Sequence, residues 1–167
     1  MSKPFVAIVM GSDSDLPVLE ASFDVLRTFE IPFEARITSA HRTPEVTKTY
    51  VEDAEMRGCA VFIAAAGMAA HLAGAVAAAT VKPVIGVPMN ASLDGMDALL
   101  STVQMPAGIP VATVAIGKAG AKNAAYLAVQ MMSLADPQLS QKLRDERAAN
   151  ADVIYAKDAA LQEKLKG

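Results

Sequence analysis

Histidine is the side chain that most readily exchanges protons near neutral pH, and this chain of 167 residues has only two, His41 and His71. His41 lies in the stretch SAHRTP at residues 39–44, where Pro44 predicts the first turn of a helix and Thr43 its N-cap. An imidazole beside a guanidinium at a helix start favours an anionic substrate and acid–base chemistry. A lone histidine in a loop is usually an ordinary surface residue, so a functional role for His41 depends on the other motifs.

A second polar stretch, GSDSD at residues 11–15, precedes another helical pattern. Ser12 and Ser14, with main-chain amides open at a helix start, can donate hydrogen bonds to a phosphate, and Arg42 would supply the opposite charge. Asp15 would repel a phosphate but can accept from sugar hydroxyls. The set therefore favours a ribose phosphate, although the same stretch taken alone is typical of a plain helix cap.

Several other kinds of site are not predicted. The sequence has neither GxxxxGK[ST] nor GxGxxG, so it indicates no nucleoside triphosphate and no dinucleotide. The single cysteine, Cys59, rules out a disulfide framework within the chain and is typical of a small buried residue rather than a nucleophile. One cysteine and two histidines are too few for an ordinary structural zinc site. We expect no metal and no cofactor.

Alternating apolar runs and helical patterns predict the elements that position these residues. Strands are expected at residues 5–10, 33–37, 61–64, 84–87 and 111–116, each followed by a helix. This alternation predicts a single α/β domain over residues 1–167, with a three-layer, doubly wound parallel sheet of flavodoxin-like order in a core at about 5–135. A more charged helix at about 137–165 is expected as a C-terminal extension.

The polar stretches all follow predicted strands. GSDSD follows the first strand, SAHRTP the second, a loop at 67–71 the third and a loop at 88–90 the fourth. Ligands of doubly wound sheets bind at the carboxyl ends of the strands. The sequence therefore predicts that four loops form one pocket there. Within it, His71 at a predicted helix start suits a structural role as well as a hydrogen bond to substrate.

Composition narrows the possible partners. A net charge of -3 and 5% aromatic residues give no sign of nucleic-acid binding. The hydrophobic content of 53% is high and favours burial between subunits. The apolar run at residues 59–81 approaches the length of a membrane span, but it is mostly alanine and is interrupted by Gly67 and Gly74, so a buried strand and helix are expected instead. With no signal-peptide pattern at the start, we expect a cytoplasmic protein without membrane contact.

Five motifs occur in one order: GSDSD at 11–15, SAHRTP at 39–44, AAHL at 69–72, LDGMDALLS at 93–101 and VQMPAGIPV at 103–111. Together they resemble the class I N5-carboxyaminoimidazole ribonucleotide mutase family of purine biosynthesis, from about Val6 to beyond Ala135. The resemblance implies a homo-octamer with active sites built from several subunits. It also implies ATP-independent, metal-free transfer of a carboxyl group from the exocyclic nitrogen to C4 of aminoimidazole ribonucleotide.

The resemblance also implies roles for individual residues. His41 would be the general acid and base, by a decarboxylation and recarboxylation course. The substrate-binding residues implied are Ser12, Asp15 and Arg42 for the ribose phosphate, and Ser39, Gly67, His71 and Leu72 for the base and carboxylate pocket.

The third loop departs from the common family pattern. Where that pattern has glycine, glycine and proline, this chain has Ala65, Met68 and Ala73, which alter the expected shape and dynamics of the loop. Two alternatives stay open. One is the related class II carboxylase, which uses carbon dioxide directly and lacks the His71-Leu72 arrangement. The other is a non-catalytic, flavodoxin-like module that binds a phosphoribosyl ligand.

Overall fold

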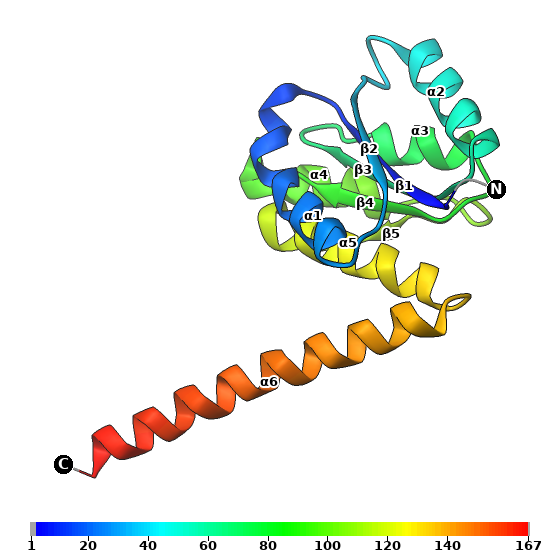
Figure 1. Ribbon diagram of the computed structural model, residues 1–167. Coiled ribbons are helices and arrows are strands. Elements are labelled where there is room, and N and C mark those ends of the chain that lie inside the picture. The colour runs from blue at the N-terminus through cyan, green and yellow to red at the C-terminus, as the bar shows by residue number, and fades with distance from the viewer. Residues whose placement is uncertain (1–2, 167) are drawn as a thin grey trace. The chain divides into compact units, whose positions relative to one another are not determined.

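The computed structural model describes residues 3–166 and contains one five-stranded parallel sheet between two layers of helices (Figure 1). The strand order is β2-β1-β3-β4-β5. The strands are β1 (Phe5–Met10), β2 (Phe33–Ile37), β3 (Cys59–Ala66), β4 (Val84–Pro88) and β5 (Ala112–Thr113). This order and the flanking helices confirm the predicted flavodoxin-like α/β fold.

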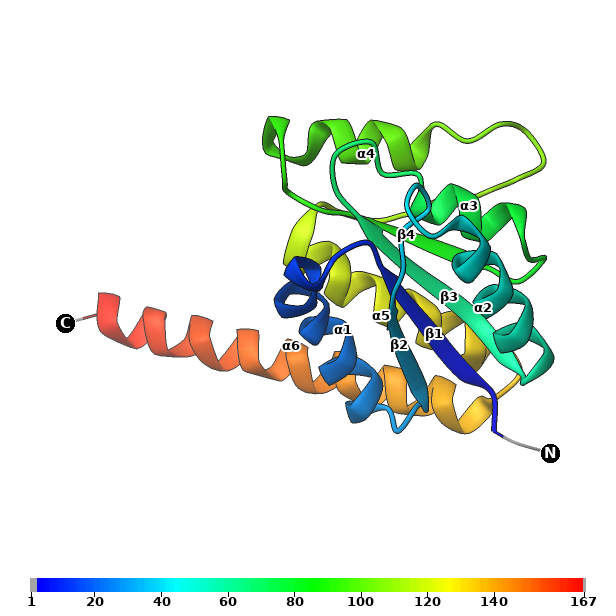
Figure 2. The same ribbon diagram turned by 90° about the horizontal axis from the view of Figure 1, so that it is seen from above.

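Helices cover both faces of the sheet (Figure 2). The helices are α1 (Leu16–Thr28), α2 (Pro44–Met56), α3 (Leu72–Ala78), α4 (Met96–Val103), α5 (Gly117–Ser133) and α6 (Pro137–Leu165), with short 3₁₀ turns η1 (Asp13–Asp15) and η2 (Leu93–Gly95). On one face, α1 and α5 are joined where the Ser22 hydroxyl donates to the Ala121 carbonyl at 2.6 Å. The other face carries α2, α3 and α4.

The centre of the sheet fixes the register of the three strands that lead to the predicted site. Ile8, Ile63 and Ile85 are paired across β1, β3 and β4, and each is fully buried at 0% exposure. These strands are buried on both faces, which is why they read as continuous apolar runs in the sequence. On the face of α3 and α4, Gly86 lets the layers approach closely, because a Cβ there would lie 2.3 Å from Thr102 Cγ2. The parallel pairing of β1, β3 and β4 brings their carboxyl ends to one edge of the sheet.

Two sequence predictions differ in detail from the structure. The fifth strand was expected at residues 111–116 but comprises Ala112–Thr113. It is an edge strand paired only with β4, and the chain then folds back so tightly that a Cβ on Gly120 would lie 1.5 Å from the Ala115 carbonyl oxygen. Thr43 precedes α2 but makes no side-chain cap; its hydroxyl instead accepts from Ser39 N at 3.0 Å, inside the loop.

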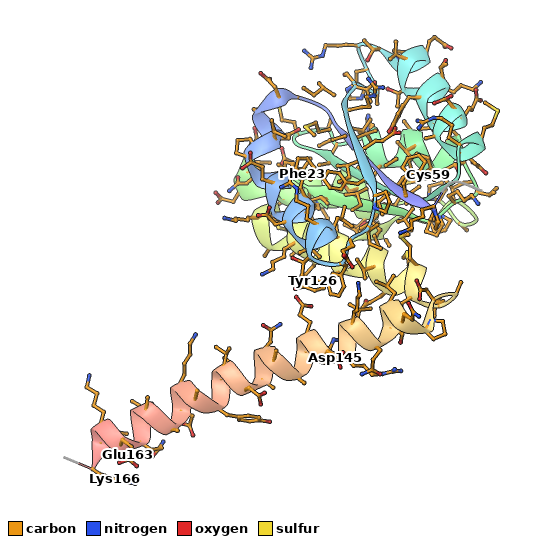
Figure 3. The ribbon with its side chains drawn as sticks, in the orientation of Figure 1. Phe23, Cys59, Tyr126, Asp145, Glu163 and Lys166 are labelled. Carbon is orange, nitrogen blue, oxygen red and sulfur yellow. The ribbon has the colours of Figure 1, made fainter. Side chains whose placement is uncertain are left out.

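The chain divides into two compact units, one up to Met131 and one from Met132 onward. The second unit contains α6, a single helix of 29 residues. Its later apolar side chains Ile154, Leu161 and Leu165 are exposed, and the Lys166 ammonium contacts the Glu163 carboxylate at 2.6 Å near its end (Figure 3). Among the helices of residues 3–166, none combines the length and apolar character needed to cross a membrane.

Asp136 caps α6: its carboxylate accepts from Gln138 N at 3.0 Å and Leu139 N at 3.1 Å. We expect Asp136→Ala to destabilise the first turn of α6 by about 1 kcal/mol. Amide hydrogen exchange at Gln138 and Leu139 should then be about fivefold faster. Asp145→Ala, in the middle of the same helix, serves as the control. Equal exchange in wild type and Asp136→Ala would contradict the capping role.

Candidate active site

A cavity of about 490 Å³ opens at the carboxyl ends of the strands. We call it the main cavity. The structure brings all nine sequence-predicted site residues to its wall: Ser12, Ser14, Asp15, Ser39, His41, Arg42, Gly67, His71 and Leu72. They come from the loops after β1, β2 and β3, because the parallel strands end at one edge of the sheet.

The first loop contributes hydroxyl groups that form hydrogen bonds with one another. Ser14 Oγ donates to Ser12 Oγ at 3.0 Å, and Ser12 Oγ donates to Asp13 Oδ1 at 3.1 Å. Ser12 Oγ also accepts from Ser14 N at 3.3 Å. These groups precede α1, so an anion bound there would meet hydroxyl and main-chain donors near a helix N-terminus. The loop therefore forms the cap that the sequence allowed, and its role as a set of phosphate donors stays a prediction.

The second loop brings the positive charge. Among the described residues that line the main cavity, Arg42 is the only arginine or lysine. Its guanidinium donates to the Gly11 carbonyl at 3.3 Å, which joins the second loop to the first. Its main-chain N–H donates to Ser39 Oγ at 3.1 Å. Ser39 therefore holds the turn that carries Arg42, in addition to lining the cavity.

The two histidines are in direct contact. His41 Nε2 lies 2.6 Å from His71 Nδ1, and the rings are perpendicular with centroids 4.8 Å apart. We call them the histidine pair. One nitrogen must donate and the other accept, so the proton of one ring is fixed by the other.

The histidine pair also separates two cavities. A second cavity of about 500 Å³ is lined by Ala40, His41 and His71 on this side, and by residues of α3 and of the segment from α4 onward, including Leu100, Gln104 and Met105. Both imidazoles therefore face two spaces. This arrangement could not be predicted from the sequence, because it depends on how α3 and α4 pack against β4.

The third loop makes a tight turn above the sheet. Gly67 is required there, since a Cβ would lie 2.9 Å from Ala91 Cβ. Met68 adopts φ +56, a left-handed conformation that is uncommon for a residue other than glycine. The chain then returns at buried Ala70 to Leu72, which is 2% exposed and lines the cavity from beneath. The third loop therefore differs locally at Met68 but still presents His71 and Leu72.

The fourth loop was predicted at residues 88–90, but its lining residue is Ala91. Pro88 and Met89 are buried, because β4 extends to Pro88 and Met89 N donates to the Ala66 carbonyl at 2.9 Å. The main cavity is thus completed one residue later than expected. Other lining residues that the sequence did not single out as binding residues are Gly11, Ala40, Ala66, Met68 and Ala69.

Burial raises the pKa of the Asp15 carboxyl above its usual 3.8, although the main-chain groups of Ser12 and Gly11 act in the opposite direction. The folded protein therefore binds this proton more tightly than the unfolded chain. Below the ordinary carboxyl pKa, burial of Asp15 costs the fold no stability. The cost begins as the pH rises past that value and reaches its full size above the folded-state pKa.

We therefore expect Asp15→Asn to be more stable than wild type near pH 7 and to lose that advantage near pH 3. Thermal unfolding at both pH values measures the difference. Glu20→Gln, at an exposed carboxylate on α1, is the matched control. A less stable Asp15→Asn at neutral pH would contradict the effect of burial.

Cys59 lies at the start of β3, at the opposite end of that strand from the main cavity (Figure 3). It is buried, and burial raises the pKa of its thiol to about 11. A thiol in this position stays protonated at neutral pH, as a structural cysteine does. No cluster of three or more His, Cys, Asp or Glu side chains suited to a metal ion occurs within residues 3–166.

The model of the AIR carboxylase family matches residues 5–153, which is most of the chain and includes every loop of the main cavity. The chain belongs to the AIR carboxylase family. Among curated members, it is 55% identical to an N5-carboxyaminoimidazole ribonucleotide mutase of Mycobacterium tuberculosis, over 96% of this chain and 91% of that protein. It is 48% identical to a mutase of the same name from Methanocaldococcus jannaschii, over 96% and 99%.

Solved structures of this family have the same fold. The crystal structure of Treponema denticola PurE superposes with a TM-score of 0.87 at 33% identity, covering 95% of this chain and 99% of that one. The family resemblance expected from the five sequence motifs is thereby confirmed. In this AIR carboxylase family member, the motifs at 11–15, 39–44 and 69–72 line the main cavity, and those at 93–101 and 103–111 contribute to the second cavity.

Proposed function

We propose that the chain is an N5-carboxyaminoimidazole ribonucleotide mutase, which forms 4-carboxy-5-aminoimidazole ribonucleotide without ATP, metal or cofactor. The observation that carries the proposal is the histidine pair in a cavity that also holds one guanidinium and a set of hydroxyl donors. That arrangement offers a proton carrier beside an anion site. The relatives at 48–55% identity carry the mutase name.

The reaction needs one proton to be given and recovered. His41 donates a proton to the exocyclic nitrogen as the N–C bond breaks, which releases carbon dioxide and aminoimidazole ribonucleotide in the cavity. C4 then attacks the carbon dioxide, a C–C bond forms, and His41 recovers the proton from C4. His71 Nδ1, at 2.6 Å from His41 Nε2, orients the imidazole and determines which nitrogen carries the proton.

The substrate is held by the residues predicted from the sequence. The phosphate accepts hydrogen bonds from the hydroxyl and amide groups of Ser12 and Ser14 and forms an ion pair with Arg42. The Asp15 carboxylate accepts hydrogen bonds from the ribose hydroxyls. The base and its carboxylate lie between Ser39, Gly67, His71 and Leu72. In this scheme the Ser12 and Ser14 hydroxyls exchange their contact with each other for contacts with phosphate oxygens.

Direct carboxylation of aminoimidazole ribonucleotide is the second candidate function. The observation that favours it is the left-handed Met68 in the third loop, where the class I pattern has glycine. A changed loop can alter how the carboxyl group is delivered while the nucleotide site is kept. The contact of His71 with His41 favours the mutase.

One assay separates these functions. The purified protein, without ATP or metal, is mixed with N5-carboxyaminoimidazole ribonucleotide or with aminoimidazole ribonucleotide plus bicarbonate, and the C4-carboxylated product is followed. Efficient conversion of the first at low carbon dioxide is expected of a mutase. Conversion of the second alone would make the protein a carboxylase, and no product from either would leave a binding module.

We also propose that the chain works as a homo-octamer in the cytoplasm. Support for self-association comes from exposed apolar side chains in and near α4, among them Leu93, Met96 and Leu100, at 76%, 48% and 51% exposure. Support for a reducing compartment is the single buried, unpaired cysteine. Light scattering after gel filtration should give eight times the chain mass; a monomer would refute the octamer.

A further inference from the structure

We infer that Met68 is the cover of the main cavity: its thioether packs on the heterocycle of the bound nucleotide and keeps released carbon dioxide from escaping. This inference rests on the proposed function and adds a residue to it. It starts from an unusual backbone. Met68 has φ +56, a conformation that costs an L-residue free energy and that glycine would adopt without strain.

Packing within the protein does not offset the free-energy cost of this conformation. The Met68 side chain is 60% exposed, whereas the neighbouring loop residues Ala70 and Leu72 are each 2% exposed. Because an exposed methionine gains little from burial, packing within residues 3–166 gives no reason for a large side chain at this position. Strained residues that line a cavity are typical of sites where a ligand supplies the missing contacts.

The turn around Met68 is fixed from both sides. On one side, Gly67 packs so closely on the fourth loop that a Cβ would lie 2.9 Å from Ala91 Cβ. On the other, Ala70 N donates to the Met68 carbonyl at 2.9 Å, and His71 N donates to the Ala69 carbonyl at 2.8 Å. Close packing at Gly67 and the hydrogen bonds after Met68 restrict the backbone of this turn, so the part at the rim that moves most freely is the flexible methionine side chain.

Chemistry makes the thioether suitable for this place. Among the described residues that line the main cavity, Met68 and Leu72 have the only large apolar side chains, and Leu72 is buried beneath. Methionine adapts its shape and makes favourable sulfur–aromatic contacts. An apolar group over the aminoimidazole ring would keep water out of the cavity while carbon dioxide is free. That interval lies between the breaking of the N–C bond and the formation of the C–C bond.

The test compares Met68→Ala and Met68→Gly with Met56→Ala. Met56 is 81% exposed and lines another cavity, with Phe33, Glu34 and Arg57, so it controls for the loss of an exposed methionine. Each protein converts N5-carboxyaminoimidazole ribonucleotide in ¹³C-bicarbonate with carbonic anhydrase present, and ¹³C in the product reports escaped carbon dioxide. Affinity for aminoimidazole ribonucleotide is measured separately by calorimetry.

Both Met68 variants should incorporate more ¹³C than wild type and bind the nucleotide roughly two- to tenfold more weakly, while Met56→Ala behaves as wild type. Unchanged label and unchanged affinity in Met68→Ala would overturn the inference. An effect in Met68→Gly alone would assign it to the backbone rather than the thioether, and would also overturn it. If wild type turns over neither substrate but binds the nucleotide, the proposed function fails and the affinity comparison still tests the cover.

Discussion

His41→Asn is expected to keep the fold and ligand affinity and to lose at least about two orders of magnitude in turnover. Asparagine keeps a polar side chain of similar reach but cannot give and recover a proton. The His41 side chain is exposed and belongs to a loop, so its replacement removes no core packing. The largest effect should therefore fall on kcat with N5-carboxyaminoimidazole ribonucleotide.

The measurement needs a control that separates proton transfer from ring positioning. His71→Asn removes the partner of His41 at 2.6 Å and leaves His41 itself in place. We expect it to lose less turnover than His41→Asn, because the proton carrier itself is still present and only the partner that orients it is gone. Circular dichroism and thermal unfolding verify the fold of both. Near-normal turnover in His41→Asn would remove His41 from the mechanism.

Arg42→Ala is expected to raise KM by roughly ten- to a hundredfold, since a hydrogen bond to a charged group contributes about 1.5–3 kcal/mol, and to change kcat much less. The reason is that Arg42 is the only arginine or lysine among the described lining residues. A phosphate contact is present in both ground state and transition state, so its loss weakens binding without slowing chemistry.

Two further variants make this result specific. Lys48→Ala removes a positive charge from α2 at a side chain that is 63% exposed and does not line the main cavity, and should leave KM unchanged. Arg42→Lys keeps the charge but loses the planar guanidinium, so an intermediate KM is expected. Unchanged affinity in Arg42→Ala would refute the phosphate assignment.

The sequence predicted the fold and the location of the site for one physical reason. Buried parallel strands read as continuous apolar runs, such as residues 5–10 and 61–64, and polar loops that follow such strands must meet at one edge of the sheet. Ser12, His41 and Gly67 could therefore be assigned to one cavity from their order alone. Their roles in binding and catalysis stay predictions.

Features that depend on packing could not be predicted. The contact between His41 and His71 spans 30 residues and is fixed by the position of α3 on the sheet. Met68 has a left-handed φ because the tight turn places it in that conformation, which methionine ordinarily avoids. The short fifth strand reflects the close approach of Gly120 to Ala115, a contact that hydrophobic pattern does not encode.

The position of the histidine pair between two cavities affects how its variants must be interpreted. Both rings line both spaces, so cutting either ring back to glycine opens a passage as well as deleting a functional group. His41→Gly would then confound chemistry with shape, which is why asparagine is the better probe of proton transfer. The same opening has a use: free imidazole added to His41→Gly can enter from either side and take the place of the missing ring, so chemical rescue becomes a direct assay of what that ring does.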